Sequence, residues 1–147
     1  MADTTGSLAA ALFGEILAVD QLIRSNVARV LPKGMELSHF TVLNHLAHGG
    51  GEKSPAQLAK NFHLTRGAMT NTLHKLEWNG WVHVRPDWDD ARRKMVAISP
   101  SGLAARNAAL AAIAPVIDDA VATVGGDRVR TALPVLRELR LKLSEIG

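Results

Sequence analysis

Charged side chains of both signs fill a loop between two short β-branched segments, and these are the residues of the chain most suited to binding chemistry. Val82 and Val84 alternate with other residues before the loop, and Val96 and Ile98 do so after it, which is typical of strands with one buried face. Five of the charged residues between them are Asp89, Asp90, Arg92, Arg93 and Lys94. Such a hairpin can hold a cation outside the globule, where it can enter the narrow, negative minor groove of DNA. An ordinary surface hairpin with solvated charges has the same pattern, because exposed ion pairs are individually weak.

A second polar set lies on one face of a helix predicted to begin with Thr65 as its N-cap and to stop at Gly80. The outward set is Arg66, Gly67, Thr70, Asn71, His74 and Lys75, and the inward set is Met69, Leu73 and Leu76. Small, hydrogen-bonding and cationic side chains suit a DNA groove, which has base edges on its floor and phosphates along its walls. A generic solvated face would carry similar residues.

The DNA interpretation is favoured because of what flanks this helix. A short helix precedes it, with Ser54 as the predicted N-cap and Pro55 at the first helical position, and the charged hairpin follows it. Two helices with a tight connection and a following hairpin indicate a winged helix-turn-helix, which places its second helix in the major groove.

Other site chemistries find less support. The chain has six histidines and no cysteine, which excludes disulfides, a thiolate nucleophile and thiolate-bound zinc. His45 and His48 are three residues apart and could share a metal ion, but a site needs a third ligand, and His39 is predicted to line an interface or pocket instead. With no phosphate-binding glycine loop after a strand, neither a metal, a cofactor nor an enzymatic activity is predicted.

Composition and charge agree with a nucleic-acid partner. The 147 residues suit one domain, and we expect a cytoplasmic, nucleoid-associated protein with no signal peptide, no membrane contact and no apolar run near membrane-spanning length. The net charge is +3; residues 54–102 hold seven basic and four acidic residues, and the remainder holds ten of each. A positive field confined to one segment attracts a polyanion.

Long amphipathic helices are predicted at both ends. The first begins at Ser7 as N-cap and continues to about Val30; the second begins at Ser38 and ends at Gly49. Ser99 and Pro100 begin an alanine-rich helix that ends at Gly125, and a last helix spans 129–146. Each of these two contains a proline, Pro115 or Pro134, which is expected to kink or interrupt it.

The predicted fold is mainly α with a small β wing, in one domain over 1–147. Residues 35–99 form the winged helix-turn-helix, called the reading head below, and residues 7–31 and 100–146 form dimerisation helices. Their apolar stripes exceed what one reading head can cover, so a second copy is expected to bury the surplus. A monomeric bundle in which the end helices pack together is the alternative.

Three segments carry a resemblance to a known family. LSHFTVLNHLA at 37–47, SPAQLAKNFHLTRGAMTNTLHKLEWNGWV at 54–82 and DWDDARRKMVAISPSG at 87–102 resemble the second helix, the helix-turn-helix and the wing of the MarR family of bacterial regulators. The resemblance extends over nearly the whole chain. It implies that Arg92 enters the minor groove and that Asp90 orients it through a charge-assisted hydrogen bond.

The expected DNA contacts follow from the positions where this chain matches the family pattern and from those where it differs. Many members have an acidic residue followed by arginine at the start of the wing, where this chain has His83 and Val84, so Arg85 is the nearest cation. Trp88 replaces a common wing proline and is expected to pack under the wing rather than touch a sugar. The full predicted set is Ser54, Pro55, Thr65, Arg66, Gly67, Met69, Thr70, Asn71, His74, Lys75, Arg85, Asp90, Arg92, Arg93 and Lys94.

The family resemblance also implies a function. It implies an intertwined homodimer that represses transcription from a pseudo-palindromic double-stranded operator and leaves the DNA when a phenolic or aromatic small-molecule effector binds. Nothing in the sequence identifies the effector or its pocket. The rival hypothesis is a winged-helix module that binds protein without reading DNA, because fold alone does not decide function.

Overall fold

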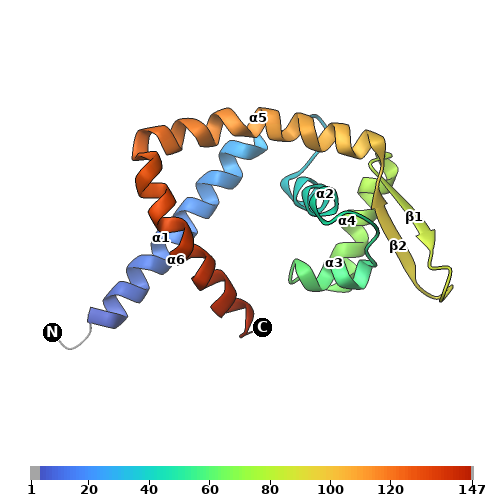
Figure 1. Cartoon of the computed structure of the whole chain (residues 1–147), viewed down its shortest axis with the longest axis horizontal. Coiled ribbons are helices and arrows are strands. Elements are labelled where there is room, and N and C mark those ends of the chain that lie inside the picture. The colour runs from blue at the N-terminus through green and yellow to red at the C-terminus, as the bar shows by residue number, and fades with distance from the viewer. Residues whose placement is uncertain (1–3, 147) are drawn as a thin grey trace.

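The structure, a computed structural model, describes residues 4–146 as six helices and one two-stranded sheet. The elements in chain order are α1 (Thr4–Ala28), α2 (Leu37–Gly49), α3 (Pro55–Asn61), α4 (Arg66–Trp78), β1 (Val82–Pro86), β2 (Lys94–Ile98), α5 (Pro100–Val124) and α6 (Gly126–Ser144). Figure 1 shows α2, α3, α4 and the sheet gathered at one end of α5, with α1 and α6 at its other half. The predicted class, mainly α with a small β wing, is confirmed.

The core lies inside the reading head. Leu43 and Leu46 from α2, Leu58 from α3, and Leu76 from α4 are among its fully buried side chains. Val96 from β2 joins the same cluster, so the wing is attached to the helices through apolar contact. Burial of this kind is the main stabilising term in a small domain, and it holds α3 and α4 at a set angle to the wing.

The sheet is an antiparallel hairpin. Val82 pairs with Ile98 at its base and Pro86 pairs with Lys94 at its outer end. Lys53, in the connection between α2 and α3, forms a further bridge with Val96, through backbone N···O distances of 3.0 and 2.7 Å. The connection before α3 is thereby tied to the second strand of the wing.

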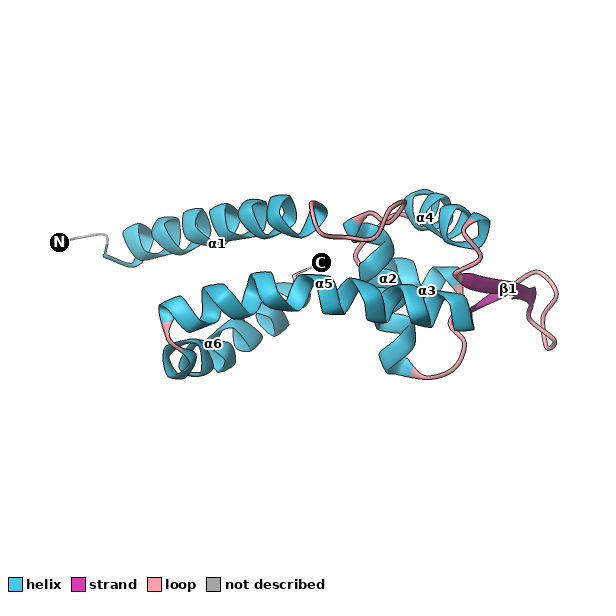
Figure 2. Ribbon diagram, turned by 90° about the horizontal axis from the view of Figure 1, so that it is seen from above, coloured by secondary structure: helices cyan, strands magenta, loops and turns pink. Residues whose placement is uncertain are grey.

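The long helices extend away from the reading head. Figure 2 shows α1 and α6 separated, with α5 between them. All described side chains from Gly6 to Ser25 of α1 are exposed, and α6 has no buried residue. Both helices therefore present apolar side chains that this single chain does not cover.

Several local predictions need correction. Ser7 lies inside α1 rather than at its cap, and α2 begins with Glu36 as N-cap rather than Ser38. Pro115 and Pro134 lie within α5 and α6, so of the two expected effects, a kink or an interruption, the interruption does not occur.

The expectation of no membrane-length apolar run is also wrong. Two helices, Gly6–Ala28 and Pro100–Val124, are long and apolar enough to cross a membrane by length and composition alone. That test is weak support for a membrane span, because core helices of soluble proteins pass it too.

Candidate nucleic-acid interface

Helix α4 divides its residues into two faces as the sequence predicts. Its N-cap is Thr65, whose hydroxyl accepts a hydrogen bond from the Ala68 N–H at 3.1 Å. The inward residues Met69, Leu73 and Leu76 are buried, and the outward residues Arg66, Gly67, Thr70, Asn71, His74 and Lys75 are all exposed. One side of the helix is thus anchored in the core, and the other offers hydrogen-bonding groups and cations to a ligand.

Helix α3 begins beside this exposed face. Ser54 and Gln57 form a reciprocal cap. The Ser54 hydroxyl accepts a hydrogen bond from the Gln57 backbone N–H at 3.2 Å, and the Gln57 side-chain oxygen Oε1 accepts one from the Ser54 backbone N–H at 2.9 Å. Pro55 occupies the first turn, as predicted. This local chemistry fixes where α3 starts and therefore how its N-terminus is presented next to α4.

A cavity of about 490 Å³, called the basic hollow here, joins α3, α4 and the wing. Its lining residues are Ser54, Pro55, Ala56, Gln57, Arg66, Thr70, Arg92, Arg93 and Lys94. Four of these nine are permanent cations and none is acidic. Two of the cations, Arg92 and Arg93, form ion pairs with Asp90 and Asp87 outside the lining. The fold therefore brings three separately predicted segments together around one concavity lined by basic side chains, which suits phosphate groups.

The wing tip is an ordered turn. The Asp87 N–H donates to the Arg93 carbonyl and the Arg93 N–H donates to the Asp90 carbonyl, both at 2.9 Å. The Asp90 carboxylate accepts from the backbone N–H and the Nε of Arg92, each at 3.1 Å. These bonds hold the pKa of Asp90 below its ordinary value, so it remains ionised opposite Arg92.

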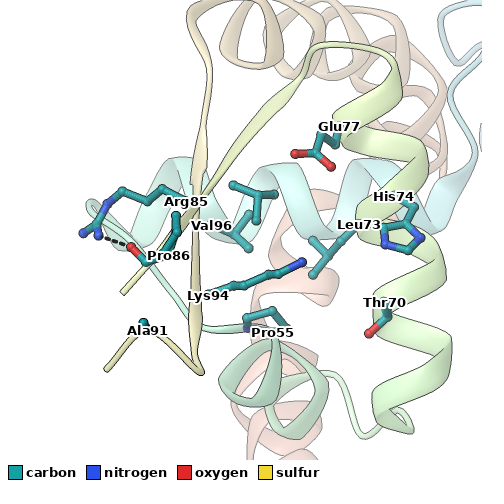
Figure 3. Close-up of a pocket in the computed structure, with 11 residues that line it drawn as sticks. Pro55, Thr70, Leu73, His74, Glu77, Arg85, Pro86, Ala91, Lys94 and Val96 are labelled. Carbon is teal, nitrogen blue, oxygen red and sulfur yellow. Dashed lines mark hydrogen bonds between the residues drawn. The ribbon is translucent and has the colours of Figure 1, made fainter. Parts of the chain in front are cut away.

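A second cavity, of about 420 Å³ and called the wing groove here, separates α4 from the sheet. Its lining residues are Pro55, Thr70, Leu73, His74, Glu77, Val84, Arg85, Pro86, Ala91, Lys94 and Val96. Figure 3 shows Lys94 pointing across this space toward α4, and Arg85 pointing away from α4. Two cations that are close in the sheet therefore point in different directions: Lys94 toward α4 and Arg85 away from it.

Two predicted contacts have other roles in the structure. Met69 is 0% exposed in the core, so its inclusion among the DNA contacts is wrong: it positions α4 from behind. Ser54 lines the basic hollow, but it is buried and its hydroxyl already caps α3.

Arg85 and Trp88 also depart from the simple prediction. Arg85 forms a salt bridge with Glu52, a bond that holds its pKa above the ordinary value, and its guanidinium lies over the Trp88 ring. Trp88 is 84% exposed, so the expectation that it packs under the wing is wrong. Sequence reasoning missed Glu52, since no local pattern links residues that are 33 positions apart.

The histidines of α2 already have partners. His45 Nε2 lies 3.2 Å from the Asn61 side chain, and His48 Nε2 lies 3.0 Å from Arg106 Nη2. No group of three potential metal-binding side chains occurs among the described residues. His39 is buried, as expected for a residue facing a pocket or interface, and burial lowers its pKa.

The model of the MarR family matches residues 33–93, which include α2, α3, α4, β1 and the whole wing loop. No curated protein sequence matches the chain. Among solved structures, the transcriptional regulator BldR from Sulfolobus solfataricus is similar with a TM-score of 0.84 and 20% identity, over 95% of this chain and 99% of that one.

Two further neighbours were solved with ligands. A mutant MarR from E. coli complexed with operator DNA has a TM-score of 0.67 and 23% identity, over 87% of this chain and 97% of that one. The organohalide-sensing regulator RdhR, bound to 2,4-dichlorophenol, has a TM-score of 0.83 and 20% identity, over 95% of this chain and 83% of that one. These structural similarities establish a shared fold, and the match of the family model confirms the family resemblance over residues 33–93.

Proposed function

We propose, from the premise that residues 33–93 match the model of the MarR family, that the chain is a sequence-specific transcriptional regulator that binds double-stranded DNA. One observation carries the proposal: the exposed polar face of α4 opens onto the basic hollow, where Arg66, Arg92, Arg93 and Lys94 converge. Arg92 and Arg93 also form ion pairs with Asp90 and Asp87, which lie outside the lining. A helix flanked by phosphate-binding cations and a cationic wing is the arrangement that DNA recognition requires.

Within this surface we assign two roles. Thr70, Asn71 and His74 are short or planar hydrogen-bonding groups on the exposed side of α4, and they discriminate base edges in the major groove. Arg66 and Lys75, together with Arg93 and Lys94 of the wing, hold phosphates and set the register of the protein on the duplex.

Arg92 has the wing's minor-groove role in this proposal. Its side chain is 91% exposed while Asp90 fixes the orientation of its guanidinium, so it projects into solvent in a defined direction. A narrow minor groove attracts a preorganised arginine more strongly than a freely rotating one, because less rotational freedom is lost on binding.

The regulator acts as a homodimer in this proposal. Leu8, Phe13 and Leu22 on α1 and Leu136 and Leu141 on α6 are exposed in the single chain. Apolar surface of that extent is covered at an interface in soluble proteins, and a second copy offers the same helices. Two α4 helices related by a two-fold axis then fit half-sites about 34 Å apart in a pseudo-palindrome.

Repression and its release by a phenolic or aromatic effector complete the proposal. The support is the family resemblance and the 2,4-dichlorophenol held by RdhR, which shares this fold. An effector releases DNA when it binds better to a conformer whose two α4 helices no longer match the half-site spacing. The protein then acts in the cytoplasm, on the nucleoid.

Selection of duplexes from a random DNA library, followed by affinity measurement at several salt concentrations, tests the proposal. We expect a pseudo-palindromic consensus and an affinity that falls steeply with salt, by roughly one unit of logarithmic slope for each phosphate cation engaged. No enriched sequence and weak salt dependence would instead support the protein-binding alternative.

A further inference from the structure

Arg85 is held by three contacts on the wing. Its Nη2 lies 2.5 Å from Glu52 Oε1, and its Nη1 donates to the Pro86 carbonyl at 2.7 Å. Its Cζ lies 3.7 Å from the centroid of the Trp88 ring, within the range of a cation–π interaction. A carboxylate, a carbonyl and an aromatic face thus bind one guanidinium; Arg85, Glu52 and Trp88 are called the wing clamp below.

The members of the wing clamp come from three separate segments. Glu52 lies in the connection before α3, next to Lys53, whose backbone pairs with Val96 of β2. Arg85 belongs to β1, and Trp88 belongs to the loop that carries Arg92. The clamp therefore connects the segment between α2 and α3 to the wing loop. Figure 3 shows its Arg85 pointing away from α4.

The clamp does not leave Arg85 free for a phosphate. The side chains of Arg85 and Glu52 are only 29% and 30% exposed, whereas the Arg92 side chain is 91% exposed. Moving Arg85 onto a phosphate would leave a half-buried carboxylate without its partner, which is costly. It would also remove the cation–π contact with the Trp88 ring at the start of the wing loop.

We propose that Arg85 is a positioning residue, which fixes the direction of the wing through Glu52 and Trp88 and thereby places Arg92 for DNA. This inference rests on the proposed DNA-binding function and deepens it. Arg85 contributes to affinity through Arg92, and it does not count among the phosphate cations. Glu52, an acidic residue beside a DNA-binding surface, supports binding for the same reason.

The substitution Glu52→Gln separates the two roles by the sign of its effect. If Arg85 is a positioning residue, Glu52→Gln and Arg85→Gln each lower affinity for the selected operator about five- to tenfold, with the salt slope unchanged. If Arg85 binds a phosphate, Glu52→Gln releases the guanidinium and raises affinity, and Arg85→Gln lowers the salt slope by about one unit. The second pattern would overturn the inference.

A double-mutant cycle tests whether Arg85 acts through Arg92. The positioning role predicts that Arg85→Gln combined with Arg92→Ala loses clearly less affinity than the sum of the two single losses, because much of the cost of a misdirected wing disappears once Arg92 is removed. Additive losses would show an independent contact and overturn the inference. Trp88→Ala should resemble Arg85→Gln, and Trp88→Phe, which retains an aromatic ring, should remain near the wild type.

Two controls keep the outcomes distinct. Thermal melting by circular dichroism identifies any variant whose loss of affinity reflects unfolding. A wild-type protein that selects no duplex would overturn both the proposed function and this inference, whereas operator binding with additive losses would overturn this inference alone.

Discussion

Asp90 accepts two hydrogen bonds from Arg92, one from its backbone N–H and one from its Nε, both at 3.1 Å. A third contact, from Nη2 to the other carboxylate oxygen, measures 3.4 Å. The acid therefore binds the turn and the side chain of the same residue. It shapes the wing tip and aims the guanidinium at once.

Removing the Arg92 side chain should weaken operator binding without unfolding the protein. We expect Arg92→Ala to cost about 1–3 kcal/mol of binding free energy, because it removes the contact that enters the minor groove. Asp90→Asn should cost less, since it leaves the cation in place but loosens its aim. Gel-shift titration with parallel circular dichroism measures both, and unchanged affinity with an intact fold for Arg92→Ala would contradict the assignment.

The exposed face of α4 should separate base recognition from phosphate binding. Alanine at Asn71 or His74 should reduce the preference for the operator over a scrambled duplex, because base-edge contacts specify sequence. Alanine at Arg66 or Lys75 should weaken both duplexes alike and lower the salt slope by about one unit each. Equal losses on both duplexes for Asn71 and His74 would show that the division of roles is wrong.

Local hydrogen-bonding chemistry was predictable from the sequence where side chain and backbone are near neighbours. Thr65, Ser54 and Ser99 are helix caps as expected, each with its hydroxyl accepting from a backbone N–H three residues on. Ser38 is not a cap, because Glu36 and His39 satisfy the start of α2 two residues earlier than a serine-based rule predicts. Several neighbouring residues can act as the N-cap of one helix, and the sequence alone does not show which of them does so.

Contacts between distant segments were not predictable. The inward face of α4 could be assigned from spacing, but the partnership of Arg85 with Glu52 depends on the path of the connection before α3. Trp88 was expected to be buried because a large ring usually is, yet it lies over Arg85 on the open side of the wing. Both errors concern tertiary placement rather than element type.

A charge placed on α1 should disrupt the proposed dimer. Phe13 is 66% exposed in the single chain, and Phe13→Glu would bury a carboxylate at the interface between copies. We expect at least a tenfold weaker dimer by analytical ultracentrifugation, and a matched loss of operator affinity. Ser101→Glu, an exposed position in the first turn of α5, is the control that should remain dimeric. An unchanged dimer in Phe13→Glu would place the interface elsewhere.

Gly102 should tolerate no side chain. A Cβ at this position would lie 1.9 Å from the Trp81 carbonyl oxygen and 2.8 Å from the Trp81 carbonyl carbon, so the backbone around the start of α5 would have to move. We expect Gly102→Ala to lower the free energy of unfolding by about 1–3 kcal/mol, the usual cost of overpacking. Gly126→Ala is the matched control, because a Cβ there meets nothing within 4 Å. Chemical denaturation of both variants gives the comparison, and equal stabilities would contradict the predicted clash.

His39 should make the stability of the reading head depend on pH. Its Nδ1 accepts the Glu36 backbone N–H at 3.0 Å, so the ring caps α2 only while that nitrogen carries no proton. Burial lowers the pKa of His39 below the ordinary value of 6.5, nearby Lys75 acts in the same direction, and Glu36 opposes them. The unfolded chain therefore takes up a proton at a higher pH than the folded one.

The direction of the effect follows from that difference. The stabilising contribution of His39 is complete above about pH 6.5 and is lost as the pH falls from there through the lower pKa of the folded protein. Denaturation at a series of pH values should show this loss in the wild type. In His39→Gln the loss of stability at low pH should be smaller, because the glutamine side chain can accept the same hydrogen bond from the Glu36 backbone N–H and does not titrate. If the wild type and His39→Gln lose the same amount of stability below pH 6.5, protonation of His39 is not the cause of the loss and the prediction is wrong.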